Sequence, residues 1–151
     1  MPTRGAKGPR VDVVSPRRRG VRSASLKRAA RFTLAKAGPD VHGDVAVLLT
    51  DDATIRRLNR RYRDVDRPTD VLAFELGDGR RPAEPFGDVV ISIETAARQA
   101  REYGATLEQE VLRLLVHGTL HLCGHDHRNA RGAARMHGLA RAILRHLARD
   151  G

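Results

Sequence analysis

The sequence predicts a single small α+β domain, in which about five helices pack on a mixed sheet of about four strands. Three observations predict this class. The length of 151 residues suits one domain with a real core. Short apolar runs typical of strands alternate with longer runs of helical periodicity. The chain also lacks repeats and internal linkers. The predicted order of elements is β-α-β-α-β-β-α-α-α, which favours helices packed on a sheet.

The N-terminal part of the chain is expected to begin with a tail and a short strand. Residues 1–10 combine Gly, Pro and basic side chains, which favours a disordered tail and leaves 11–151 as the domain. The run 11–14 is predicted to be a short edge strand. A helix follows, with Ser25 as its expected cap and Gly38-Pro39 as its stop signal.

Two strands and a helix are predicted in the middle of the chain. The pattern at 44–50 is typical of a buried strand. Either Thr50 or Asp51 is expected to cap the next helix, which carries apolar residues at 55, 58 and 62. A polar loop then leads into a strand at 71–74.

The C-terminal half is predicted to be mostly helical. A loop at 76–87 and a strand at 87–93 precede a helix at 94–103, which Gly104 ends. Asn129 is expected to cap the last helix. The side chains that this helix is expected to bury are Met136, Leu139, Ile143 and Leu147.

The net charge of +10 lies entirely in the first quarter of the chain. Residues 1–37 hold eleven Lys or Arg and one acid, whereas the remainder holds seventeen of each sign. Such a block predicts a surface for polyanions, above all nucleic acid, with a solvated tail or an organellar transit peptide as alternatives. No apolar run is long enough to cross a bilayer, and one cysteine excludes an internal disulfide. We therefore expect a cytoplasmic protein without a membrane or disulfide-linked partner.

Three histidines within eleven residues, His117, His121 and His127, have the spacing of a metal site. Two His four residues apart project from one face of a helix, and the apolar face of 107–115 predicts that helix. Gly124 is expected to end it in a left-handed turn, so that the third imidazole can reach the same ion. Three imidazoles leave one position for water, which suits a catalytic Zn²⁺, with Ni²⁺, Cu²⁺ or Co²⁺ as alternatives.

The histidine spacing matches that of the metzincin metalloproteases except at one position. Gly118 stands where those enzymes carry their catalytic Glu. The general base for peptide hydrolysis is therefore missing from its usual place, which disfavours a protease. A bound metal could still activate water and polarise a phosphoryl oxygen.

The residues around the histidines have more than one interpretation. Cys123 is expected to be a buried helical cysteine that points away from the ligands. His125 lies in the predicted turn and faces either solvent or substrate. Asp126 either orients a ligand, acts as a base through water, or stabilises the turn.

Four segments together resemble the YbeY family of bacterial endoribonucleases. The similarity runs in order from about residue 44 to 140 and rests on 59–63 (NRRYR), 67–74 (RPTDVLAF), 87–92 (GDVVIS) and 116–127 (VHGTLHLCGHDH). There are departures at Ala73-Phe74-Glu75, where the family often has Ser-Phe-Pro, and at His125, where it often has Tyr. Glu75 places a negative charge near the expected cleft.

The resemblance implies a metal-dependent, single-strand-specific endoribonuclease that matures ribosomal RNA, notably the 3′ end of the small-subunit RNA, and takes part in ribosome quality control. Its partners would be ribosomal RNA and the ribosome or ribosome-associated proteins. The resemblance places the ligands of one zinc ion on His117, His121 and His127. It also places a conserved Arg on Arg63 and a conserved Asp on Asp88.

The hypothesis that follows assigns roles around the metal. Arg63, Asp88 and Asp126 are the expected catalytic residues, and Arg63 also binds substrate with Arg67 and Asp70. Other interpretations stay open. Arg63 could form a surface salt bridge, Asp70 could cap the loop or hold Arg63, and Asp88 could face the cleft or end a loop. The alternative functions are a metal-dependent amide or ester hydrolase and a non-enzymatic ribosome assembly factor with a structural metal.

Overall fold

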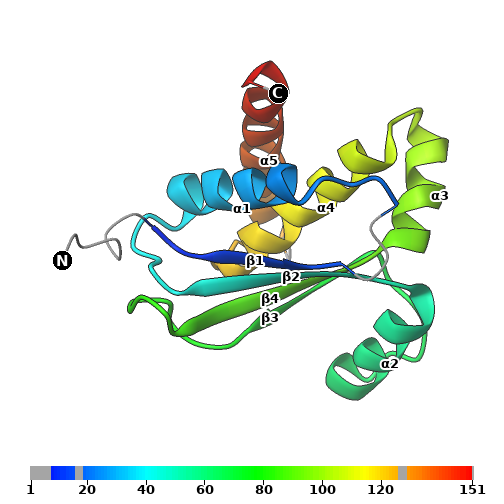
Figure 1. Cartoon of the computed structure of the whole chain (residues 1–151), viewed down its shortest axis with the longest axis horizontal. Helices are drawn as coiled ribbons and strands as arrows, with labels where there is room; N and C mark the ends of the chain where they lie inside the picture. Colours follow the sequence, from blue (N-terminus) through cyan, green and yellow to red (C-terminus); the bar gives the residue numbers. More distant parts are fainter. Residues whose placement is uncertain (1–7, 16–18, 126–128, 151) are drawn as a thin grey trace.

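The computed structural model of the protein describes residues 8–15, 19–125 and 129–150. Their elements follow the predicted order β-α-β-α-β-β-α-α-α (Figure 1). The elements are β1 (Val11–Val14), α1 (Ser23–Ala37), β2 (Asp44–Thr50), α2 (Asp52–Arg63), β3 (Val71–Glu75), β4 (Pro85–Ser92), α3 (Ile93–Tyr103), α4 (Leu107–Leu122) and α5 (Ala130–Asp150).

The sheet is mixed, with the strand order β1-β2-β4-β3. Strands β1, β2 and β4 are parallel, and β3 runs antiparallel to β4. The predicted α+β class with four strands and five helices is confirmed, and so is the edge position of β1. The second edge strand is β3, because the chain turns back after it and inserts β4 beside β2.

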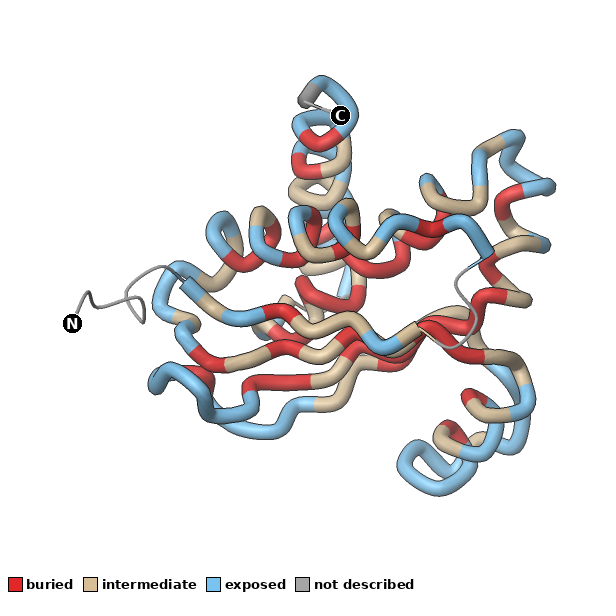
Figure 2. Tube along the Cα trace, in the orientation of Figure 1, coloured by how far each residue is buried: buried red, intermediate tan, exposed pale blue. Residues whose placement is uncertain are grey.

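The helices cover the two faces of the sheet unequally. Helices α1 and α4 lie over one face, α2 lies over the other, and α5 projects away from the sheet (Figure 1). The larger core joins α1, α4 and α5 to strand residues such as Val47, Val89 and Ile91. A smaller core joins Ile55 of α2 to Leu72 and Val90. The buried residues, red in Figure 2, lie mainly in the sheet and in the helices that pack against it. In the described part of the chain, no helix is long and apolar enough to span a bilayer.

Local capping signals position most of the helices as the sequence predicts. Asp51 accepts a hydrogen bond from the Thr54 N–H at 2.8 Å, and Asn129 accepts one from the Gly132 N–H at 2.7 Å. Both satisfy backbone donors that have no partner inside the helix. Gly104 ends α3 with φ 65°, a left-handed conformation that suits glycine.

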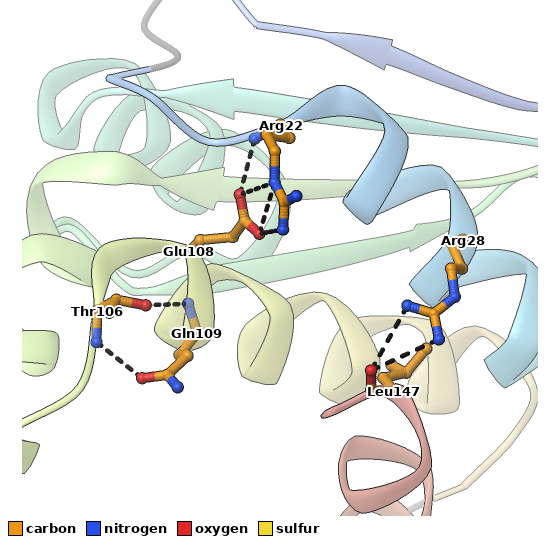
Figure 3. Close-up of polar contacts among 6 residues, drawn as sticks. All are labelled: Arg22, Arg28, Thr106, Glu108, Gln109 and Leu147. Carbon is orange, nitrogen blue, oxygen red and sulfur yellow. Dashed lines mark hydrogen bonds and ion pairs between the residues drawn. The ribbon is translucent and has the colours of Figure 1, made fainter. Parts of the chain in front are cut away.

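The start of α1 differs from the prediction. The helix begins at Ser23 without a side-chain cap, so Ser25 does not cap it. Instead, the Arg22 N–H donates to Glu108 of α4 at 3.0 Å, and the Arg22 guanidinium pairs with the same carboxylate at 2.7 Å (Figure 3). The Ser25 hydroxyl also binds Glu108. A contact far away in sequence therefore replaces the expected local cap.

Candidate active site

A cleft of about 510 Å³ opens between strand β3 and the C-terminal half of α4. The open edge of the sheet forms one wall, and the helix that carries two of the predicted metal ligands forms the other. The residues that line it are Arg63, Thr69, Asp70, Val71, Leu72, Ala73, Glu75, His117, His121 and Leu122. The structure therefore brings together Arg63, Asp70 and two histidines from three separate segments of the chain.

His117 and His121 lie one helical turn apart on α4 and face the cleft together. Their ring centroids are 5.0 Å apart, with the ring planes at 60°. Both side chains are half-buried. A capping box between Thr106 and Gln109 begins the helix at the end away from the cleft (Figure 3). The predicted pairing of these two imidazoles on one helical face agrees with this arrangement.

Gly118 lets α4 approach the sheet closely. A Cβ at this position would lie 2.8 Å from Val89 Cγ1 and 3.1 Å from Val71 Cγ2. Real Cβ atoms essentially never show the first of these distances, so a side chain at 118 would require the valine side chains or the helix to shift. The absence of a Glu at this position therefore has a packing cause.

A left-handed turn ends α4 soon after the second histidine. Gly124 adopts φ 89°, its N–H donates to His121 O at 3.0 Å, and the His125 N–H donates to Leu120 O at 3.0 Å. These two bonds form a Schellman motif, in which a left-handed residue closes the helix end. The predicted left-handed turn at Gly124 is confirmed. His127 and Asp126 lie outside the described residues, and the described part of the chain holds no group of three metal-binding side chains.

Cys123 ends α4 and is half-buried. A Cβ on Gly38 would lie 3.0 Å from its Sγ, so the thiol lies against the segment that follows α1. Burial raises the pKa of Cys123 to about 11. The thiol is therefore protonated at neutral pH, as expected of a packing residue.

Arg63, at the end of α2, reaches the open edge of β3. Its Nη2 donates to Ala73 O at 2.6 Å, and its guanidinium lies 5.3 Å from the centroid of the Phe74 ring. In β3 the residues at even positions bond to β4, as Leu76 does through Phe86 O. Odd positions such as Ala73 therefore turn their carbonyls outward. The Arg63 side chain lies across that free edge and is held beside the histidines.

Asp70 supports the entry of β3. Its Oδ1 accepts from the Val71 N–H at 2.8 Å, and its Oδ2 accepts from Gln99 Nε2 of α3 at 3.3 Å. Among the described contacts, Ala73 rather than Asp70 holds Arg63. Of the two interpretations of Asp70, these contacts agree with capping. Gln99 carries no motif that sequence reasoning could have used.

Asp88 and Arg67 lie apart from the cleft lining. Val89 of β4 belongs to the core beneath α4, whereas Val90 packs toward α2, so Asp88 faces the α2 side. Burial raises the pKa of the Asp88 carboxyl. Arg67 is exposed, and its backbone oxygen accepts from Asn59 Nδ2 at 2.9 Å, which ties the loop to α2.

The sequence motifs missed part of the cleft wall. Thr69 and Leu122 line the cleft within the segments 67–74 and 116–127, but no role was assigned to either side chain. Glu75 also lines the cleft, as expected from its place in the chain, and brings a carboxylate to the end away from Asp70 along β3.

Together, the fold and the cleft define a small α+β protein whose reactive groups gather between a histidine-bearing helix and an open sheet edge. A family model described as Endoribonuclease YbeY matches residues 18–148. The chain therefore belongs to the YbeY endoribonuclease family, which confirms the predicted resemblance.

Similar proteins extend this comparison. The chain is 45% identical over 131 residues to "Endoribonuclease YbeY" of Moorella thermoacetica, covering 80% of this chain and 83% of that protein. It is 53% identical over 104 residues to the protein of that name from Myxococcus xanthus, covering 67% of this chain but only 35% of that longer protein. A solution structure of a Thermotoga maritima protein superposes with a TM-score of 0.65 at 28% identity, covering 91% of this chain and 88% of that one.

Proposed function

We propose that this protein is a metal-dependent, single-strand-specific endoribonuclease of the cytoplasm. Its substrate would be ribosomal RNA, notably the 3′ end of the small-subunit RNA, and it would also serve ribosome quality control. The observation that carries the proposal is the convergence of His117, His121 and Arg63 on one cleft in a chain of the YbeY family.

The metal ligands in this proposal are His117, His121 and His127. The first two fit, since their rings lie 5.0 Å apart on one helical face and imidazole nitrogen is a favoured ligand of Zn²⁺. The left-handed turn at Gly124 ends the helix three residues after His121. Zn²⁺ is the proposed ion, with another divalent transition metal as the alternative. When bound, such an ion polarises a phosphoryl oxygen or lowers the pKa of bound water.

Arg63 is proposed to bind the scissile phosphate. A guanidinium has five N–H donors, and the bond to Ala73 O uses one of them. That bond and the contact with Phe74 fix the direction of the side chain. The remaining donors can then bind phosphate oxygens as charge develops on them, without reorganisation.

The exposed face of α2 would guide RNA to this residue. The helix carries five arginines, and Arg56 forms an ion pair with Asp66 at 2.9 Å. The side chains of Arg57, Arg60 and Arg61 are exposed on the same helix. Such cations attract the RNA backbone with little sequence preference.

The remaining predicted residues take supporting roles in the proposal. Asp126 precedes a metal ligand in sequence and is proposed to act as the residue that would move a proton in the cleft during cleavage. Asp70 is proposed to bind substrate at the cleft wall, and Arg67 is proposed to bind it on the exposed loop outside the cleft lining. Asp88 faces α2. We therefore propose that it helps to hold the strands beneath Arg63 in place and does not contact RNA.

Two observations disfavour the amide hydrolase alternative. Gly118 leaves no room for the general base that a protease of this spacing needs. Arg63 also occupies a carbonyl on the free edge of β3, where an extended peptide would have to pair. Cleavage of a single RNA strand requires neither a Glu at position 118 nor an unoccupied backbone edge on β3.

The proposal is tested by cleavage of small-subunit precursor RNA by the metal-loaded protein. We expect Arg63→Ala to lower the cleavage rate by about 10²-fold or more, as for removal of a positioned transition-state donor. His121→Ala should abolish cleavage. The matched controls Arg80→Ala and His137→Ala remove exposed side chains of the same kinds outside the cleft and should leave the rate unchanged. Undiminished cleavage by both cleft variants would show that the site lies elsewhere.

A further inference from the structure

Helices α1 and α5 carry almost only positive charge. Helix α1 contains Lys27, Arg28, Arg31 and Lys36 without an acid, and the only acid of α5 is Asp150 at its end. The α5 arginines are Arg131, Arg135, Arg141, Arg145 and Arg149. In the sequence, the whole excess of positive charge lies in the first quarter of the chain. In the fold, helix α1 of that quarter contacts α5, which is a second basic helix.

One face of α1 contacts α5 where the two helices cross. Arg28, Phe32 and Lys36 are four residues apart and so share that face. Arg28 donates to Leu147 O at 3.5 Å (Figure 3), and Phe32 stacks on His146 with ring centroids 4.2 Å apart and planes at 6°. Lys36 Nζ lies 5.5 Å from the Phe32 ring centroid. The first two contacts hold α1 against α5, and the third places Lys36 beside the stacked rings.

Three arginines form a stripe along α5. Arg141, Arg145 and Arg149 are four residues apart and all exposed. Like charges at this spacing destabilise a helix. Among the described residues, no ion pair links any of the three to an acid. The stripe therefore gathers three like charges with no acidic partner among the described residues, which is the pattern expected where an external anion supplies the compensating charge.

The two helices enclose a groove of about 400 Å³. Its lining includes Lys36 from α1 and Arg145 and Arg149 from α5, beside the stacked rings. Membrane-surface helices carry large apolar side chains opposite their cations. In the described part of the chain, the exposed large apolar side chains all lie outside α1 and α5. The groove thus favours a polyanion over a lipid surface.

We propose that this groove and the α5 stripe, here called the α1/α5 face, bind the phosphate backbone of RNA at a distance from the cleft. The identification of the anion as RNA rests on the proposed function. Helix α5 begins soon after the histidine-bearing helix ends, and its rise puts residues 141–149 about 15–30 Å along its axis. A strand that leaves the cleft and follows α5 reaches the face only if it is long enough.

The test compares a short and a long single-stranded RNA of about four and about sixteen nucleotides. The variant Lys36→Glu/Arg145→Glu/Arg149→Glu is measured against Arg80→Glu/Arg81→Glu/Arg101→Glu, which makes the same charge change at exposed positions elsewhere. We expect only the first to lose affinity for the long RNA, by about tenfold or more at low salt. The slope of log affinity against log salt should fall by about 2, or 0.7 for each lost contact. Affinity for the short RNA should not change.

Several results would overturn the proposal. They are an equal loss in both triple variants, unchanged affinity for the long RNA, or binding of anionic vesicles that the first variant loses while its RNA affinity stays. Circular dichroism checks that the variants fold. If Lys36→Glu/Arg145→Glu/Arg149→Glu unfolds, the same three residues are changed to Gln instead. His121→Ala separates this surface from the proposed activity, because it should lose cleavage yet keep its affinity for the long RNA.

Discussion

Position 118 shows how one residue sets both packing and chemistry. With no Cβ, Gly118 brings α4 against Val89 and Val71, and that contact fixes where the flanking histidines lie. The spacing of His117 and His121 was enough to predict that they face one way. The reason for the glycine between them was not predictable, because it depends on strands that are distant in sequence.

Two glycines in helices should respond to alanine in opposite directions. Gly118→Ala inserts a methyl group into a filled core and should cost about 1–3 kcal/mol of unfolding free energy. Gly138→Ala meets nothing within 4 Å on α5 and should stabilise the protein by about 0.5–1 kcal/mol. Urea denaturation of both variants measures the difference, and a neutral Gly118→Ala would show that α4 is not held at this distance.

At the level of elements, local signals predicted more than distant contacts did. Asp51, Asn129 and Gly104 act within a few residues, so their helix ends could be predicted from the sequence. Ser25 failed as a cap because Glu108, more than eighty residues later, binds the first turn of α1 instead. The start of β4 at Pro85 was also missed, since pairing with β2 extends the strand into a segment whose composition indicates a loop.

The junction of α2 and α3 should give the protein an acid-sensitive component of stability. Burial acts to raise the pKa of Asp52, but hydrogen bonds from Ser92, Thr95 and Arg98 outweigh it and hold that pKa below its ordinary value of 3.8. A carboxylate whose folded pKa is depressed stabilises the fold above its unfolded pKa. This stability is lost as the pH falls through the folded pKa.

Replacement of this carboxylate should remove that component. We expect Asp52→Asn to lower the unfolding free energy at neutral pH by about 1–2 kcal/mol, because charge-assisted bonds become neutral ones. Its stability should also fall less steeply than that of the unchanged protein below pH 3.8. Denaturation at several pH values tests this, with exposed Asp40→Asn as the control. Parallel pH profiles for the two variants would contradict the assignment.

For the whole molecule, strand order was the part of the fold that the sequence could not supply. Apolar patterns predicted the strands and their number, but nothing local states that β4 inserts beside β2 and leaves β3 at the edge. That placement creates the cleft, because it brings Arg63 and β3 under the histidines of α4. The motifs thus identified the participants of the site, and the topology arranged them.

Metal binding should stabilise the whole fold, because the proposed ligands span the end of α4 and the segment that leads to α5. At a Zn²⁺ concentration 100-fold above its Kd, the expected gain is about 2.7 kcal/mol. For a chain of this size that corresponds to a rise in Tm of about 5–10 °C. Differential scanning calorimetry of the metal-free protein with and without added Zn²⁺ measures it. His121→Ala should lose the rise and exposed His137→Ala should keep it, whereas an equal rise in both would place the ion elsewhere.

The hydrogen bond from Arg63 to Ala73 O has a consequence for solubility as well. An uncovered edge strand is a template on which other chains can add strands, and proteins commonly protect such edges with charged side chains. Of the two edges here, β1 is only four residues long, and β3 has a guanidinium lying across an outward carbonyl. The arginine that we propose to hold phosphate thereby also opposes edge-to-edge aggregation of the protein in a crowded cell.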